Sequence, residues 1–269
     1  MTGIRAIRLV TQDARRLATF YADALGFRVE PTDTSPPDPF SPLGRRVTLT
    51  LGAQRIELVE PEEPVADTGP VTANDVRFQH FALVATDMAR AHDRLSRTSG
   101  WSAITQGGPQ RLPESSGGVT AFKFRDPDGH PLEFLAFPPD AVPDRWAGQR
   151  PDGDGALLGI DHTAITVTDT ARSLSHYAAL GLRKVGGSIN TGPAQAALDG
   201  VPAPRVEVTR LQAEGARPPH VELLCYGETH GTTTGDTDLL ATRILGAAGT
   251  TALRDPDGHR WIGATDSEA

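Results

Sequence analysis

The sequence predicts an α+β fold made of four tandem units, each a strand, a helix and then three further strands. Two internal repeats indicate this organisation. Residues 3–13 match residues 159–169 in their order of apolar and polar side chains, and the string Arg-Asp-Pro-Asp-Gly-His occupies both 125–130 and 254–259. Since self-similarity along a chain marks a repeat architecture, the two halves are predicted to share one fold.

The opening of a unit has a recognisable pattern. In residues 79–87, apolar side chains alternate along a predicted strand that ends in Asp87, and Met88, Ala91 and Leu95 follow at helical spacing. An aspartate at such a junction can cap the first turn of a helix. Residues 160–169 repeat this pattern, so each half of the chain itself contains two units.

Spacing and composition divide the chain. The predicted units are 1–62, 76–140, 157–228 and 229–266. The fourth is short, and its opening strand is expected to be reduced or lost. A stretch rich in proline and glycine separates the halves, so we expect an N-terminal domain at 1–140, a linker at 141–156 and a C-terminal domain at 157–269.

Composition excludes several classes of protein. The 269 residues carry a formal net charge of −8, without the basic stripe that nucleic-acid binding requires. No apolar run approaches the ~18 residues of a membrane span, and the first residues do not resemble a signal peptide. The single cysteine, Cys225, excludes an internal disulfide and a cysteine-rich zinc module. A cytoplasmic protein is therefore expected.

Four ionisable side chains stand in the middle of predicted strands. Glu133 and Glu222 each have apolar neighbours, and a buried carboxylate is costly unless it is paired or bound to metal. His80 and His162 lie on alternating strands on the face opposite the core side chains. Two histidines and two glutamates form a donor set suited to Zn, Ni, Co, Mn or Fe(II).

These motifs resemble the vicinal oxygen chelate (VOC) superfamily, which includes glyoxalase I, extradiol dioxygenases and bleomycin-binding proteins. The resemblance rests on the openings Ile-x-His-x-x-Ile-x-Val-x-Asp and on the closing Asp-Pro-Asp-Gly-His-x-x-Glu, and it covers nearly the whole chain. It implies two half-barrel domains, each made of two units around a cavity. It also implies a divalent metal held by residues on the first and last strands of the units.

Transferring the ligand positions unit by unit gives unequal results. Unit two supplies His80 and Glu133, and unit three supplies His162 and Glu222. Unit one offers Ala6 and Glu57, and unit four has Ile262 in place of a glutamate. Glu57 is thus a secondary candidate, and so is His220, which lies two residues before Glu222 and should face the same cavity.

Two pairings of the units remain open. If units two and three share a barrel, it holds His80, Glu133, His162 and Glu222, while units one and four form a barrel without metal. If neighbouring units pair, one barrel holds Glu57, His80 and Glu133. We favour the first arrangement because it leaves one complete site and one vestigial site.

The resemblance supports three functional hypotheses. The first is a metal-dependent lyase or isomerase that binds a small metabolite through two vicinal oxygens, with Glu133 and Glu222 as catalytic residues that move a proton and stabilise an enediolate or oxyanion. The second is an Fe(II) extradiol-type dioxygenase. The third is a binding protein for an antibiotic or toxin. The expected partner is a small molecule, with no nucleic acid and no membrane, and the chain can be a monomer or a homodimer.

Overall fold

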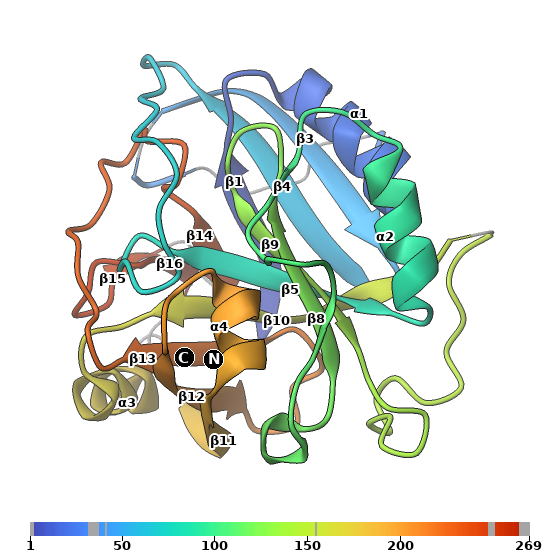
Figure 1. Ribbon diagram of the computed structural model, residues 1–269. Coiled ribbons are helices and arrows are strands. Elements are labelled where there is room, and N and C mark those ends of the chain that lie inside the picture. The colour runs from blue at the N-terminus through green and yellow to red at the C-terminus, as the bar shows by residue number, and fades with distance from the viewer. Residues whose placement is uncertain (1–2, 32–37, 41, 154, 247–250, 264–269) are drawn as a thin grey trace.

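Two mixed β-sheets form the described part of the molecule (Figure 1). The structure is a computed structural model that describes residues 3–31, 38–40, 42–153, 155–246 and 251–263. Its elements repeat the predicted order of strand, helix and strands, which confirms the α+β fold class. No helix in these ranges is long and apolar enough to cross a membrane.

Units one and two follow the predicted pattern closely. Unit one contains β1 (Ile4–Val10), α1 (Ala14–Leu25), β2 (Arg28–Val29), β3 (Leu43–Leu51) and β4 (Gln54–Pro61). Unit two contains β5 (Gln79–Ala85), α2 (Met88–Ser96), β6 (Ser102–Ala103), β7 (Gln110–Arg111), the short 3₁₀ helix η1 (Glu114–Ser116), β8 (Thr120–Arg125) and β9 (Pro131–Ala136). The helices α1 and α2 lie side by side (Figure 1).

Units three and four differ in length. Unit three contains β10 (Leu157–Thr166), α3 (Thr170–Ala179), β11 (Leu182–Thr191), α4 (Pro193–Asp199), β12 (Arg205–Ala213) and β13 (His220–Tyr226). The helix α4 is an addition to the repeat that the sequence did not predict. Unit four contains the short strands β14 (Arg243–Gly246), β15 (Thr251–Arg254) and β16 (Arg260–Gly263). Its opening strand, β14, is therefore reduced but present.

An aspartate caps each of the three helices that open a unit. Asp13, Asp87 and Asp169 accept hydrogen bonds from backbone N–H groups of the first turn, at 3.0, 3.0 and 2.9 Å respectively. These N–H groups have no partner inside the helix, so a carboxylate there stabilises its start. The aspartates at the predicted junctions thus fix where the strands end and the helices begin.

The two sheets pair the units in the swapped order. The nine-stranded sheet has the order β11-β12-β13-β10-β5-β9-β8-β6, with β7 beside β8, and so combines units two and three. The seven-stranded sheet, β15-β16-β14-β1-β4-β3-β2, combines units one and four. The antiparallel pairs β5–β10 and β1–β14 join the units. The neighbour-paired alternative does not describe these sheets.

The hydrophobic clusters group the units differently from the sheets. The largest cluster packs α1 and α2 between strands of units one and two, together with the first residues of β10. A second cluster packs α3 with strands of units three and four. Each unit therefore shares a sheet with one unit and most of its side-chain core with another.

The repeated Asp-Pro-Asp-Gly-His string connects units across this packing. In its first copy, the carboxylate of Asp126 accepts from the Tyr21 hydroxyl at 3.0 Å and lies 2.8 Å from Nδ1 of His130. In its second copy, Asp255 accepts from the Tyr177 hydroxyl at 2.7 Å. All five side chains are buried. The aspartates therefore anchor the opening helices of units one and three.

The predicted linker packs against the nine-stranded sheet. Trp146 is only 3% exposed and packs with Val84 and Leu158. Its indole N–H donates to the carboxylate of Asp161 at 2.6 Å. A segment that composition identified only as a connection therefore contributes to the structure around β10.

Replacing Tyr177 with phenylalanine tests this anchoring. We expect Tyr177→Phe to lower the free energy of unfolding by about 1–3 kcal/mol, because Asp255 loses a buried hydrogen-bond donor. Tyr21→Phe should have a similar effect at the equivalent position, and Val185→Ala, at an exposed residue, should change stability by less than about 0.5 kcal/mol. Urea denaturation measures all three. Equal stability of Tyr177→Phe and wild type would contradict the anchoring role.

Candidate metal centre

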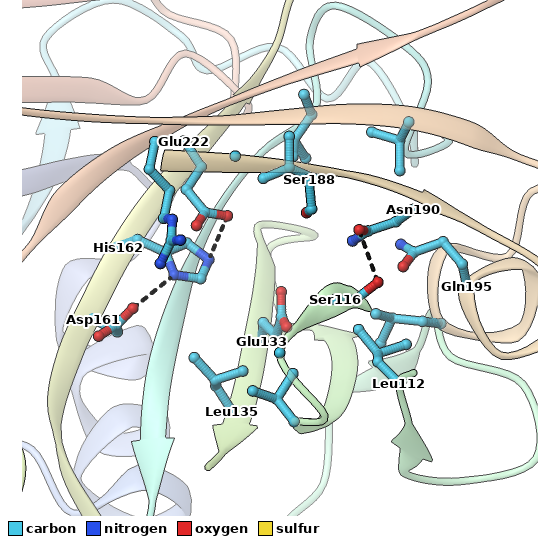
Figure 2. A pocket seen from close by; sticks show the side chains of 18 of the residues that line it. Leu112, Ser116, Glu133, Leu135, Asp161, His162, Ser188, Asn190, Gln195 and Glu222 are labelled. Carbon is cyan, nitrogen blue, oxygen red and sulfur yellow. Dashed lines mark hydrogen bonds and ion pairs between the residues drawn. The ribbon is translucent and has the colours of Figure 1, made fainter. Parts of the chain in front are cut away.

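The four residues selected from the sequence lie on four adjacent strands. In the order β13-β10-β5-β9, these strands carry Glu222, His162, His80 and Glu133. All four side chains line one cavity of about 380 Å³ on the nine-stranded sheet (Figure 2). This volume lies within the range of small-molecule sites. The structure thus brings together residues that are far apart in the sequence.

Two alanines leave room for these side chains. Ala82 pairs with His162 on one side and Glu133 on the other, and Ala164 likewise pairs with His80 and Glu222. Residues opposite each other on adjacent strands have Cβ atoms only ~5 Å apart, so a large residue at either position would fill the space. Small residues between the four ionisable groups therefore keep the cavity open.

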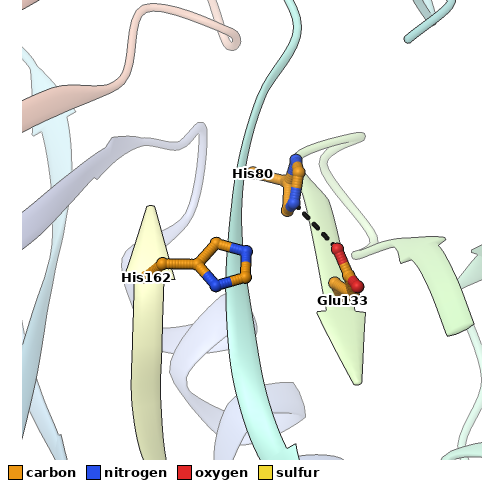
Figure 3. Close-up of side chains that lie close together, drawn as sticks. All are labelled: His80, Glu133 and His162. Carbon is orange, nitrogen blue, oxygen red and sulfur yellow. Dashed lines mark ion pairs between the residues drawn. The ribbon is translucent and has the colours of Figure 1, made fainter. Parts of the chain in front are cut away.

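His80, Glu133 and His162 form one group of candidate metal ligands (Figure 3), and Asp161, His162 and His220 form a second that shares His162. Nε2 of His80 lies 2.9 Å from Oε2 of Glu133, and one candidate donor atom from each residue lies within 4.8 Å of the other two. Donors ~2.1 Å from one metal ion are ~3–4 Å apart, so modest side-chain adjustment suffices for common coordination.

The imidazole of His80 supports a ligand role. It is 2% exposed, yet neither ring nitrogen makes a hydrogen bond with the described residues, although Nε2 approaches Glu133. Buried polar atoms in native proteins usually have a partner, so an exception requires an explanation. The Nδ1 atom without a hydrogen-bond partner in the described chain and the carboxylate beside Nε2 fit a site that receives a metal ion.

A β-bulge places Asp161 beside His162. Ile160 pairs with Leu83 and His162 with Ala82, so two residues of β10 occupy the space opposite one residue of β5. Both Asp161 and His162 consequently line the cavity. Oδ2 of Asp161 lies 3.1 Å from Nδ1 of His162, and because a carboxylate only accepts, Nδ1 carries the proton and Nε2 faces the cavity.

Neighbouring residues hold Asp161 in place. Trp146 Nε1 and the Arg145 guanidinium both donate to Oδ1 of Asp161, at 2.6 and 3.0 Å. Burial would raise the pKa of Asp161, but the hydrogen bond from His162 and the nearby cations hold it well below its usual range. Asp161 is therefore ionised and fixes the orientation of the His162 ring.

The pKa values of the two histidines are shifted in opposite directions. Burial, together with the nearby Lys123 ammonium, lowers the pKa of His80 to about 4. Burial also opposes protonation of His162, but the carboxylates of Glu222, Asp161 and Glu133 raise its pKa to about 9. In the metal-free protein at neutral pH, the His80 ring is therefore neutral, whereas the His162 ring is protonated on both nitrogens and positively charged.

Glu222 lies outside the group of His80, Glu133 and His162. Its Oε2 is 3.7 Å from Nε2 of His162, and its Oε1 is 3.3 Å from Nε2 of His220. Burial would raise the pKa of Glu222, but His162 and His220 hold it at about 2. The secondary candidate His220 thus faces the cavity and contacts Glu222, as its sequence position predicts.

The other secondary candidate, Glu57, lies in the seven-stranded sheet. It is fully buried on β4 and pairs with the guanidinium groups of Arg8 and Arg5, at 2.8 and 3.1 Å. Glu57 is not among the residues that line the cavity described above. The structure therefore separates Glu57 from the four residues of the nine-stranded sheet.

Strand register identifies the positions of the seven-stranded sheet that correspond to the four ionisable residues. Glu57 corresponds to Glu222, and the other three positions are occupied by Ala6, Arg243 and Ile262. Arg243 takes the place of His80, and its Nε lies 2.8 Å from the buried carboxylate of Asp38. Two residues without ligand atoms and one guanidinium make this sheet unsuited to the same metal site.

Several residues of the cavity escaped the sequence analysis. They are Lys123, Arg145, Asp161 and Tyr226. The polar, turn-rich segment 190–200 lies between two strands of unit three, a position that by itself suggests the border of the cavity, and it supplies Asn190 and Gln195 to the lining. The acidic residue directly before His162 was the available signal for Asp161, but simple strand alternation assigns it to the opposite face.

Comparison with known proteins agrees with the fold. A family model described as "Glyoxalase/Bleomycin resistance protein/Dioxygenase superfamily" matches residues 3–134. Unit three repeats the order of strand, helix and strands, whereas the described residues of unit four form three strands without a helix. Residues 3–134, which contain nearly all of units one and two, therefore match this superfamily, and the fold of the described chain resembles that of the vicinal oxygen chelate proteins. No curated protein matches the sequence significantly.

Solved structures show the same fold at low sequence identity. Glyoxalase I from Zea mays is similar with a TM-score of 0.58 and 15% identity, over 98% of this chain and 92% of that one. A variant of that enzyme gives a TM-score of 0.61, also at 15% identity, over 97% and 92% of the two chains. A protein from Bacillus subtilis named "putative dioxygenase" gives 0.51 and 16% over 92% and 71%. At these identities the similarity concerns the fold alone.

The raised pKa of His162 predicts how stability depends on pH without metal. Protonated His162 stabilises the folded state fully below its unfolded pKa of ~6.5, and this contribution is lost as pH rises toward about 9. In chelator-treated protein, the difference in melting temperature between wild type and His162→Gln should therefore shrink between pH 6.5 and 9. A difference that is constant or grows over this range would contradict the assignment.

The placement of Glu57 predicts a structural effect without loss of metal. Glu57→Gln should lower the free energy of unfolding by roughly 3–5 kcal/mol, because it leaves the buried Arg8 guanidinium without this carboxylate. Metal content should equal that of wild type. Glu62→Gln, at an exposed glutamate, is the matched control and should change stability by less than about 0.5 kcal/mol. Loss of metal in Glu57→Gln would contradict the separation of the two sheets' sites.

Proposed function

We propose that this protein is a metal-dependent lyase or isomerase that acts on a small metabolite bound through two adjacent oxygen atoms. The observation that carries this proposal is the convergence of His80, Glu133, His162 and Glu222 on one cavity from four adjacent strands. When bound among these residues, a divalent metal supplies a positive charge that stabilises an oxyanion. The superfamily and the fold are consistent with this assignment.

The two glutamates are suited to different roles. Glu133 lies 2.9 Å from His80, and its side chain is 8% exposed. Burial would raise the pKa of Glu133, but Lys123 and His80 lower it, so it stays ionised and suits a ligand. Glu222 lies outside both groups of candidate ligands, and its side chain is 16% exposed. It is therefore the better candidate for a carboxylate that moves between holding metal and accepting a proton.

Proton transfer by Glu222 gives a balanced reaction. The carboxylate removes a proton from the hydroxyl-bearing carbon next to the substrate carbonyl; the electron pair of that C–H bond forms a C=C bond, and the π pair of the carbonyl moves onto its oxygen. Return of this proton to the former carbonyl carbon, together with transfer of the hydroxyl proton to the other oxygen, completes an isomerisation. His220, 3.3 Å from Glu222, is placed to orient this carboxylate or to exchange its proton.

A second candidate is an Fe(II) ring-cleaving dioxygenase. The group His80, Glu133 and His162 is a set of two histidines and one carboxylate, which is typical of Fe(II) sites that activate oxygen. Against this candidate, Glu222 adds a further carboxylate beside His162. The third hypothesis, binding of an antibiotic or toxin, requires no metal.

Metal analysis of tag-free protein tests the proposal. We expect about one divalent metal per chain in wild type and its loss in His80→Ala, Glu133→Ala and His162→Ala, because each change removes a donor. Glu57→Gln is the control that should retain metal. Wild type that takes up no metal even after reconstitution would contradict the proposal and favour a binding protein.

Reaction assays then separate the two enzymatic candidates. In D2O, wild type should catalyse deuterium incorporation beside the carbonyl of small α-hydroxyketones, and Glu222→Gln should lose most of this activity, by roughly 10²–10⁴-fold for loss of a general base. Iron as the bound metal together with oxygen uptake on catechols would instead identify the dioxygenase.

A further inference from the structure

The end of the cavity remote from His162 and Glu222 has a different character. Figure 2 shows Ser116, Asn190 and Gln195 gathered there, with Leu112 beside them and Leu135 nearer Glu133. Ser116 belongs to η1 of unit two, and Asn190 and Gln195 belong to β11 and α4 of unit three. The cavity thus has an ionisable end, apolar walls and an end of amide and hydroxyl groups.

A buried carboxylate fixes the position of the Gln195 side chain. Oδ2 of Asp199 accepts from Gln195 Nε2 at 2.7 Å and from the Tyr226 hydroxyl at 2.9 Å. Oδ1 of Asp199 accepts from the Lys123 ammonium at 2.7 Å. Burial would lower the pKa of Lys123, but Asp199, Glu133 and Glu222 raise it, so the pair is ionic. Asp199 is 1% exposed and both of its oxygens have partners.

This arrangement determines which way the Gln195 amide points. A carboxylate cannot donate, so the N–H₂ group of Gln195 must face Asp199 and its Oε1 must point elsewhere. Oε1 is buried and has no hydrogen-bond partner among the described residues, although Gln195 lines the cavity and is only 4% exposed. An acceptor held in this way is satisfied by a ligand that donates a hydrogen bond.

Asn190 adds the complementary group. Its Oδ1 accepts from the Ser116 hydroxyl at 2.8 Å, so its N–H₂ group is the donor at this end of the cavity. An acceptor on Gln195 and a donor on Asn190, both uncharged, match a group that both gives and receives a hydrogen bond. A carboxylate on the ligand has no hydrogen to donate, so its lone pairs would face the Oε1 atom of Gln195 and repel it.

We propose that Gln195 and Asn190 form a specificity site for a neutral group with a hydrogen-bond donor, a hydroxyl or a carboxamide, at the substrate end remote from the vicinal oxygens. This inference rests on the proposed function, because it takes the His/Glu end of the cavity as the place where those oxygens bind. The substrate class is then a small metabolite with a polar, uncharged tail.

Lysine usage is consistent with a dedicated structure at this end. The chain contains 26 lysines and arginines, of which only Lys123 and Lys184 are lysines. Lys123 is one of the few charged residues buried in the cavity wall, and its compact ammonium fits between Asp199 and the ring of Phe78. A planar guanidinium is larger and spreads its donors, so it could not replace this contact.

Hydroxamates provide a test that does not require the substrate. A hydroxamate presents two adjacent oxygens to a metal, and its carbon chain can end in a methyl, a hydroxyl or a carboxylate group. Three such series, matched over several chain lengths, are titrated calorimetrically into metal-loaded wild type, Gln195→Met and Gln106→Met. Methionine keeps the side-chain length of glutamine and removes both the Oε1 acceptor and the donor to Asp199, whose carboxylate keeps the Lys123 and Tyr226 donors. The exposed Gln106 lies outside the cavity, so its variant is the matched control.

We expect one chain length at which the hydroxyl-terminated compound binds wild type and Gln106→Met about tenfold more tightly than the methyl-terminated one, as for one buried hydrogen bond. The carboxylate-terminated compound should bind most weakly. In Gln195→Met the hydroxyl preference should fall to less than about twofold. A structure of the metal-loaded complex should show the hydroxyl within hydrogen-bond distance of Gln195 Oε1.

Failures of the two proposals have different signatures. Hydroxamates that bind wild type without any preference for the hydroxyl, or with a preference that survives in Gln195→Met, would overturn the specificity site and leave the proposed function standing. Metal-loaded protein that binds no hydroxamate would overturn both. Comparing the affinities of wild type for the methyl-, hydroxyl- and carboxylate-terminated compounds requires no variant. This comparison therefore tests the specificity site even if Gln195→Met does not fold.

Discussion

The antiparallel pairing of β5 with β10 is the constraint on which the cavity depends. It joins two strands from different halves of the chain and places them at the centre of the nine-stranded sheet. Their parallel neighbours, β9 and β13, then bring one glutamate to each side of the two histidines. Because the register sets an alanine opposite each ionisable residue, a slip of one residue would turn these side chains to the other face.

The seven-stranded sheet shows what the same scaffold does without this cavity. The positions of Ala82 and Ala164 are taken there by Leu245 and Arg8, which fill the space between the strands. Arg8 and Arg243 both lie within 3.2 Å of the Asp38 carboxylate. Fixed guanidinium groups thus supply positive charge to buried carboxylates in one sheet, whereas the other sheet leaves histidines and glutamates around an open space.

The sequence predicted the features that recur in several units, but it did not predict the local departures from the repeat, such as the β-bulge and α4. The capping aspartates, the strand alternation and the duplicated Asp-Pro-Asp-Gly-His string predicted the units. The resemblance to a known family then selected His80, Glu133, His162 and Glu222, and the pairing that brings them together was favoured over a neighbour-paired alternative. Asp161 was missed because a β-bulge breaks the alternation that assigns faces. The individual roles of Gln195 and Asp199 were not predicted because α4 is an insertion, whose position is set by tertiary contacts with unit two and by no periodic pattern.

The division between sheets and cores has a consequence for synthesis on the ribosome. The strands of the nine-stranded sheet are complete once residue 226 has emerged, whereas β1 must wait for β14, nearly the whole chain later. The sheet that carries the cavity can therefore form first, while one edge of unit one stays unpaired. The pairing of β1 with β14 joins residues separated by nearly the whole chain, so it can form only when the end of the chain has emerged.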